Sequence, residues 1–159
     1  MSRGFTIVEM LLYMGILTGF LVVLTQLFTS IIDVQLESQA TGPLAQDSRY
    51  IFSRLAYDIG RAEEVTTPGA AGVTTQSLGL MIGGVPHTYS VSGSNLTLES
   101  GAETNNLNSY GTQVSTLSFT RLGNTDGKHT VQIRYTITST TQRVSGVQTK
   151  TMQTTIGVR

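Results

Sequence analysis

The chain has 159 residues, a formal net charge of zero and a charged fraction of 13%, which is low for a soluble domain. Its ten basic side chains are spread along the chain, so the sequence carries no clear electrostatic signal for nucleic acid. The lack of cysteine excludes disulfides and thiolate-bound metals. This length suits one domain with an attached element.

The first element that the sequence predicts is a membrane-spanning helix. Residues 10–32 contain no charged side chain and consist mainly of Leu, Ile, Val, Met and Phe. At about 1.5 Å per residue this run covers roughly 35 Å, enough to cross a hydrocarbon core of about 30 Å. Arg3 precedes the run and favours a cytoplasmic N-terminus, with the remaining chain outside. The small residue Gly4 comes before the run, whereas a secretory signal has its small-residue cleavage site after it.

One acid, Glu9, lies at the start of the apolar run. A carboxylate at membrane depth costs several kcal/mol unless it is paired, so such a residue indicates function by default. The alternative is a position in the interface, where the positive end of the helix dipole stabilises an anion.

Two glycines, Gly15 and Gly19, form a G-x-x-x-G pattern inside the apolar run. Glycines four residues apart lie on one face and allow helix backbones to approach closely. The alternative is that two glycines occur there by chance.

A second, amphipathic helix is expected over residues 42–65. Residues 41–43, Thr-Gly-Pro, are expected to interrupt the first helix at about residue 41, because proline lacks an amide donor. Asp47 and Asp58 are assigned to the polar faces, and Tyr50 and Tyr57 to a seam against a sheet. The stripe that needs a partner surface recurs at spacings of three and four: Leu44, Ser48, Ile51, Leu55, Ile59 and Ala62.

The remaining residues, 66–159, are rich in Thr, Ser, Gly and Val and alternate between apolar and polar positions, which is typical of strands. Residues 100–109 are expected to form a loop, and residues 123–127 a hairpin turn rather than a calcium loop. The predicted fold is α+β, with a long N-terminal hydrophobic helix continuing into an amphipathic helix packed on an antiparallel β-sheet. The predicted strands cover residues 114–119, 131–137, 78–82, 88–91, 96–98 and 151–158.

The β-rich region shows no convincing catalytic or metal-binding group. His87 and His129 fall on separate predicted strands and lack metal-ligand spacing, so we interpret them as strand or surface residues. No serine lies in a nucleophile-elbow context. We therefore expect no enzyme activity, no cofactor and no metal.

The N-terminal residues resemble the signal of the type IV pilin superfamily. Gly4 is followed by Phe5, then by an acid at the fifth mature position, Glu9, and an apolar helix, which is that family's class III prepilin signal. The resemblance is strong from Gly4 to about residue 36. The helix that follows is similar to J/W-type minor pilins and pseudopilins through Asp47, Arg49, Tyr50, Ile51, Arg54, Leu55, Asp58 and Ile59. Gln26 stands where the family often has proline, and the absent cysteines exclude a disulfide-bounded loop; both departures fit a minor subunit.

This resemblance implies processing and assembly. A prepilin peptidase would cut between Gly4 and Phe5 and remove residues 1–4, and the new Phe5 amine would be N-methylated by the same peptidase/methyltransferase. The mature helix, residues 5–41, would sit in membrane lipid before assembly. In the filament Glu9 would meet the Phe5 amine of a neighbouring subunit.

The function that follows is a pilin-like subunit for pilus biogenesis, type II secretion or DNA uptake. Its partners would be other pilin subunits, the peptidase and the filament assembly platform. It would be a single-pass inner-membrane protein with an extracytoplasmic C-terminal domain, and would reach a cell-surface filament after assembly. The alternative is a membrane-anchored extracytoplasmic β-domain that acts as a binding or adhesion module.

Overall fold

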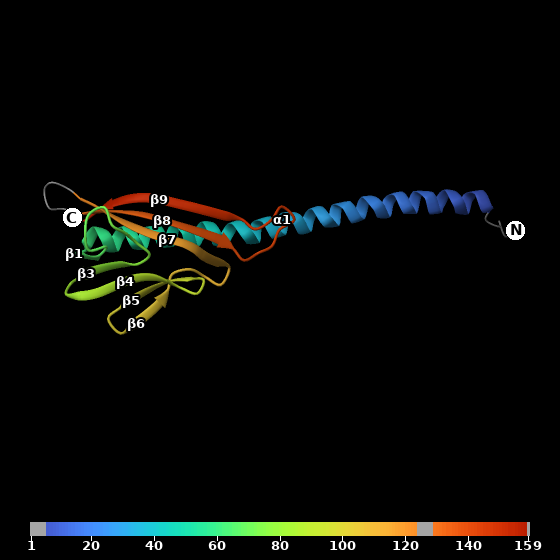
Figure 1. The fold of residues 1–159 in the computed structure, drawn as a ribbon. Coiled ribbons are helices and arrows are strands. Elements are labelled where there is room, and N and C mark those ends of the chain that lie inside the picture. The colour runs from blue at the N-terminus through green and yellow to red at the C-terminus, as the bar shows by residue number, and fades with distance from the viewer. Residues whose placement is uncertain (1–5, 124–128, 159) are drawn as a thin grey trace. The chain divides into compact units, whose positions relative to one another are not determined.

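The computed structural model describes residues 6–123 and 129–158 of the chain. The chain divides into two compact units, one ending at Ser38 and one beginning at Gln39, and a single helix, α1 (Ile7–Arg61), contributes to both. The described residues then form nine strands (Figure 1). These are β1 (Glu64–Thr67), β2 (Thr74–Thr75), β3 (Leu78–Ile82), β4 (Val85–Ser92), β5 (Asn95–Ser100), β6 (Glu103–Asn106), β7 (Thr112–Leu122), β8 (Thr130–Ser139) and β9 (Thr149–Gly157).

The strands form two antiparallel sheets where the sequence predicted one. The first has the order β1-β3-β4-β5-β6 and the second β2-β7-β8-β9, and Figure 1 shows them as separate groups. The α+β class is confirmed. The division into two sheets arises because β2 leaves its neighbours in sequence and pairs with β7, through Thr74 with Thr120 and Thr75 with Phe119.

All six predicted strands are present, and three further strands were not predicted. β6 lies inside residues 100–109, the predicted loop; all four of its residues are exposed and polar, so it has no alternation to detect. β1 begins at Glu64, which the sequence assigned to the helical region, and β2 has only two residues. The expected turn over residues 123–127 lies mostly outside the described residues.

The predicted interruption at residues 41–43 is wrong, because α1 continues through Pro43. Proline removes one helical hydrogen bond, but this loss is local. On either side Ala40 and Leu44 are buried, so tertiary packing holds both flanking turns in the helix. Pro43 itself packs closely on Gly111: a Cβ atom added to that glycine would lie 3.2 Å from the Pro43 Cβ.

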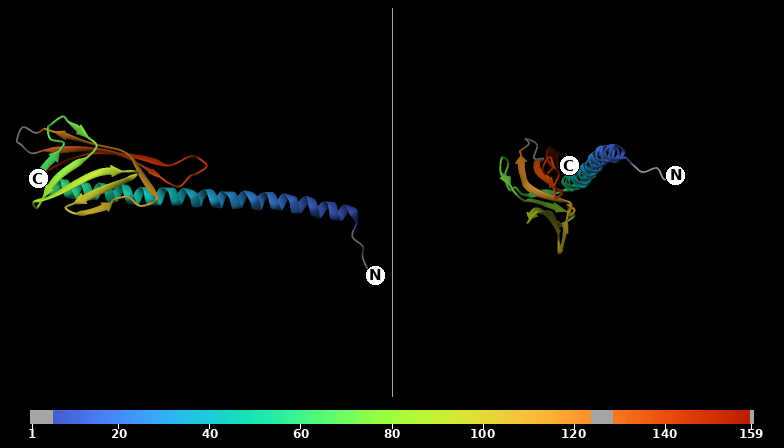
Figure 2. Two further views of the ribbon diagram at one scale, coloured as in Figure 1. Left: turned by 60° about the horizontal axis from the view of Figure 1, so that its bottom comes forward. Right: turned by 90° about the vertical axis from the view of Figure 1, so that its right-hand side faces the viewer.

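The core of the second unit lies between α1 and the sheets. Figure 2 shows the strands of both sheets on one side of residues 39–61 of α1. Every member of the predicted apolar stripe is buried, as expected. Tyr50 and Tyr57, however, are 52% and 60% exposed, so their assignment to the helix–sheet seam is wrong. The largest side chains that fill the core are Tyr89, Tyr135 and Phe119.

Asp58, which the sequence placed on a polar face, is completely buried. Its Oδ2 atom accepts hydrogen bonds from Arg54 Nε at 2.8 Å and from the Tyr89 hydroxyl. Asp58 also forms an ion pair with Arg61, with 3.3 Å between Nη2 and Oδ1. Burial raises the pKa of Tyr89, and its hydrogen bond to the Asp58 carboxylate raises that pKa further. Asp58 therefore joins α1 to β4 through a charged cluster.

Asp47 is buried too, although the sequence assigned it to solvent. Its Oδ2 atom accepts from the Ser109 amide at 2.9 Å, the Ser109 hydroxyl at 2.8 Å and the Thr112 hydroxyl at 2.5 Å. At the next residue of α1, the Tyr135 hydroxyl donates to the Ser48 carbonyl at 2.8 Å. These contacts fix α1 against the loop before β7 and against β8.

We predict that Asp58→Ala lowers the free energy of unfolding of the β-domain by about 2 kcal/mol, because it leaves the buried Tyr89 hydroxyl without its acceptor and removes both ion pairs. Denaturant unfolding of the full chain in detergent, followed by near-ultraviolet circular dichroism, measures this. Glu99→Ala, at an exposed acid on β5, is the control and should change stability by less than about 0.5 kcal/mol. A loss in Asp58→Ala no larger than the control's would contradict the structural role of the cluster.

Candidate assembly helix

The N-terminal part of α1 is a helix segment long and apolar enough to cross a membrane. None of this segment is buried within the structure, whereas the core helix of a soluble protein has its apolar side chains covered. Large apolar side chains are exposed on every face, among them Leu11, Leu12, Met14, Leu17, Phe20, Leu21 and Phe28. A surface of this kind needs lipid or other helices around it.

The threonine hydroxyls within the segment are satisfied by the helix itself. The hydroxyls of Thr18, Thr25 and Thr29 donate to main-chain carbonyls three or four residues earlier, at 2.8–2.9 Å. Donors that are already paired can enter an apolar environment at little cost. The threonines are therefore compatible with membrane depth.

Glu9 lies in the first turn of α1. Its amide donates to Thr6 Oγ1 at 3.3 Å, and its Oε1 atom accepts a hydrogen bond from the Tyr13 hydroxyl at 3.2 Å. Among residues 6–123 and 129–158, no basic side chain lies within ion-pair distance of Glu9. The Tyr13 hydroxyl fills one acceptor position but carries no charge, so within the described residues the negative charge is not compensated. Tyr13 was not predicted as a site residue, although its spacing of four from Glu9 is the signal for such a contact.

The other predicted assembly residues divide into two groups. Gly4 and Phe5, the predicted cleavage and methylation sites, lie outside the described residues. Gly15 and Gly19 lie four residues apart on α1, and a Cβ atom added to either would meet nothing within 4 Å. The packing of a single chain therefore does not require glycine at these positions, which leaves contact with a second helix as a reason for them.

The two histidines belong to the second unit. His87, on β4, is buried, and its ring nitrogens lie 3.0 Å from the Val85 carbonyl oxygen and the Ser100 hydroxyl. His129 is half-buried next to β8. Within the part of the chain that the structure describes, no three His, Asp or Glu side chains gather as a metal site would require.

Comparisons of the chain with models of known protein families, with curated proteins and with solved structures give no match. The similarity to known proteins lies in the architecture. A long N-terminal apolar helix packed against antiparallel sheets is a pilin-like layout.

Proposed function

We propose that the chain is a pilin-like subunit, a minor pilin or pseudopilin, that is assembled from the membrane into a filament through α1. One observation carries the proposal: a membrane-length apolar helix, exposed on every face, begins with an acid that has no counter-charge among the described residues. The folded β-domain attached to this helix is the part that remains in water.

Processing supplies the missing positive charge. Cleavage between Gly4 and Phe5 creates an α-amino cation four residues before Glu9, about 6 Å along a helix. Methylation of this amine keeps its charge. The carboxylate then pairs with the amine of its own or of a neighbouring subunit, and in a low dielectric this attraction is strong, although desolvation offsets much of it. A pair that forms between neighbours sets the axial register of the subunits.

Tyr13 holds the carboxylate before assembly. Its hydroxyl donates to Glu9 within the described residues, and a hydrogen bond lowers the free energy of a carboxylate in an apolar setting without neutralising it. A cation from another subunit is the stronger partner. In assembly, a charged hydrogen bond from the cation therefore replaces the neutral hydrogen bond from Tyr13 or is added to it.

The proposal implies a set of partners and a location. The partners are other pilin subunits, a prepilin peptidase with methyltransferase activity, an assembly platform, and membrane lipid before extraction. The N-terminus faces the cytoplasm and the β-domain lies outside the inner membrane, until the subunit enters a filament of a pilus, type II secretion or DNA-uptake system. The role is structural, with no enzymatic step performed by this chain.

We predict that the mature protein begins at Phe5 and carries one methyl group on its amine. Mass spectrometry of the intact chain and of its N-terminal peptide, purified from cells, measures both changes. The matched control is the same chain from cells that lack the peptidase, which should retain Met1. A mature chain that starts at Met1, or after residue 32, would favour the alternative of an anchored or secreted binding module.

We predict that Glu9→Gln leaves membrane insertion intact and lowers incorporation into filaments about tenfold or more. The amide keeps the shape of the side chain and an acceptor for Tyr13, but it cannot form an ion pair, and a charged hydrogen bond contributes about 1.5 kcal/mol or more. Immunoblots of sheared filaments and of membranes give the ratio. Asp33→Asn, which neutralises another exposed acid of α1, should incorporate normally. Normal incorporation of Glu9→Gln would mean that the charge does not direct assembly.

We predict that Gly15→Ile also lowers incorporation while the β-domain remains folded. Since a side chain at this position meets nothing in the single chain, any loss reports on a contact with another helix. The same filament assay applies, with the near-ultraviolet spectrum as the folding check. Gly60→Ile is the control, because Gly60 is another open glycine of α1, lies outside the apolar segment and does not precede a proline. Equal losses in both variants would assign the effect to the helix itself.

A further inference from the structure

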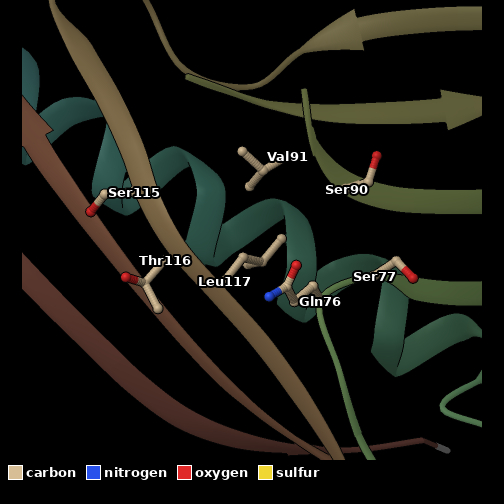
Figure 3. Close-up of a pocket in the computed structure, with 7 residues that line it drawn as sticks. All are labelled: Gln76, Ser77, Ser90, Val91, Ser115, Thr116 and Leu117. Carbon is tan, nitrogen blue, oxygen red and sulfur yellow. The ribbon is translucent and has the colours of Figure 1, made fainter. Parts of the chain in front are cut away.

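A cleft of about 400 Å³ opens between the two sheets of the β-domain. Its seven lining residues come from β4, from β7 and from the link between β2 and β3. None of the seven is charged, and five carry a hydroxyl or a carboxamide. In Figure 3, the apolar side chains of Val91 and Leu117 lie in the middle of this cleft, with the Gln76 carboxamide beside Leu117. The cleft thus has an apolar centre and a neutral polar rim.

One wall of the cleft is an uncovered edge of β7. This strand pairs with β8 along its length, but on its other side it pairs with β2 only near its C-terminal end. Arg121 directs its main chain to that other side: its amide donates to the Val73 carbonyl at 3.1 Å, and its carbonyl accepts from the Gly72 amide at 2.7 Å. Alternate residues of a strand face the same edge, so Leu117 directs its N–H and C=O there as well. No described strand pairs with β7 on that side at Leu117.

The opposite wall is an uncovered edge of β4. The ladder between β3 and β4 ends at the pair Leu78 and Tyr89, because β3 begins there. The Pro86 carbonyl accepts from the Gly101 amide, on the β5 side. By the same alternation, Val91 directs its N–H and C=O to the β3 side, two residues beyond the last pair. Val91 and Leu117 therefore present main-chain donors and acceptors to the same cleft.

Hydrogen bonds between the sheets hold both ends of the cleft. At one end the Val114 amide donates to the Ser94 carbonyl at 2.9 Å, next to the irregular step in the β7 ladder between Val114 and Thr116. At the other end Arg121 Nη1 donates to three carbonyls of the first sheet and its following loop, those of Val65, Pro68 and Gly69, at 3.0–3.1 Å. The opening is therefore pre-formed, as binding sites usually are.

We propose that this cleft binds a short extended segment of a partner polypeptide with uncharged side chains. Main-chain pairing with a strand edge supplies affinity, and a pocket for alternate side chains supplies selectivity. The edges at Leu117 and Val91 provide the main-chain pairing, and the apolar centre of the cleft provides the pocket for side chains. A charged side chain would lose water there without gaining a partner. At about 3.3 Å per residue, the open stretch of β7 accommodates about three residues.

The segment is expected to come from a different protein. A segment that pairs with both walls of the cleft needs both of its own edges open, whereas each of the nine strands in the described residues is already paired on at least one side, so a second copy of this chain offers no such strand from those residues. All seven lining residues of the cleft belong to the β-domain, so peptide binding there does not depend on whether the chain enters a filament.

The test uses the full chain in detergent micelles and a blocked pentapeptide that alternates serine and valine. We expect the amide signals of Val91 and Leu117 to shift saturably in ¹H–¹⁵N spectra as the peptide is added, and the hydrogen exchange of the Leu117 amide to slow on binding. The pentapeptide has the sequence Val-Ser-Val-Ser-Val, and the same peptide with lysine in place of its central valine should bind more weakly, because the cleft offers no carboxylate.

Two variants assign the binding to the cleft. Val91→Trp fills its centre and should weaken peptide binding about tenfold or more. Gln76→Trp blocks it from an exposed position, which keeps the test valid if the first variant does not fold. Ser92→Trp, at the exposed neighbouring residue, is the matched control and should bind normally.

Three results would overturn the proposal. One is the absence of a saturable shift at millimolar peptide in the unmodified chain. Another is an equal loss of binding in Ser92→Trp. The third is a shift of the same amides by a neutral sugar such as maltose without any shift by the peptide, which would assign the cleft to a carbohydrate.

Discussion

The first part of α1 is apolar on every face, and this surface must be removed from water. A helix that is amphipathic can cover its stripe with one sheet, but a helix that is apolar all round needs lipid or other helices about it. The other features of the segment fit this constraint. Its threonine hydroxyls are paired with the helix main chain, and its glycines leave room for the backbone of another helix. Its single acid lies at a depth where a carboxylate requires a partner of opposite charge.

The second part of α1 solves a different problem with the same backbone. Its buried stripe packs on two sheets, and two acids, Asp47 and Asp58, attach it to them through hydrogen bonds and ion pairs. Buried charge is weak evidence for stability, but its geometry admits few alternatives, so these acids favour one register between helix and strands. The folded domain built in this way is complete without the apolar segment. Under the proposed function, the surroundings of the apolar helix change from lipid to other helices while the β-domain keeps its fold.

The two sheets meet without merging, and this has a consequence for recognition. A single continuous sheet would pair β4 and β7 to other strands along their full length. Here the ladders stop at Tyr89 and at Phe119, and the main chain beyond them faces a neutral cleft. Uncovered edges are places where extended segments add. The short length of this edge and the bonds at both of its ends limit such pairing to a small segment, which protects the domain from aggregation through this edge.

The sequence by itself determined the features that depend on local pattern: the apolar run, the acid at its start, the stripe from Leu44 to Ala62, and the strands that alternate in polarity. Tertiary structure alone decided the rest. The helix continues through Pro43 because buried neighbours outweigh one lost hydrogen bond, and Asp47 and Asp58 are buried because distant strands bring hydroxyls and amides to them. The partition of the strands into two sheets, and with it the cleft, depends on which edges meet across long stretches of chain, and no local pattern of side chains encodes that pairing.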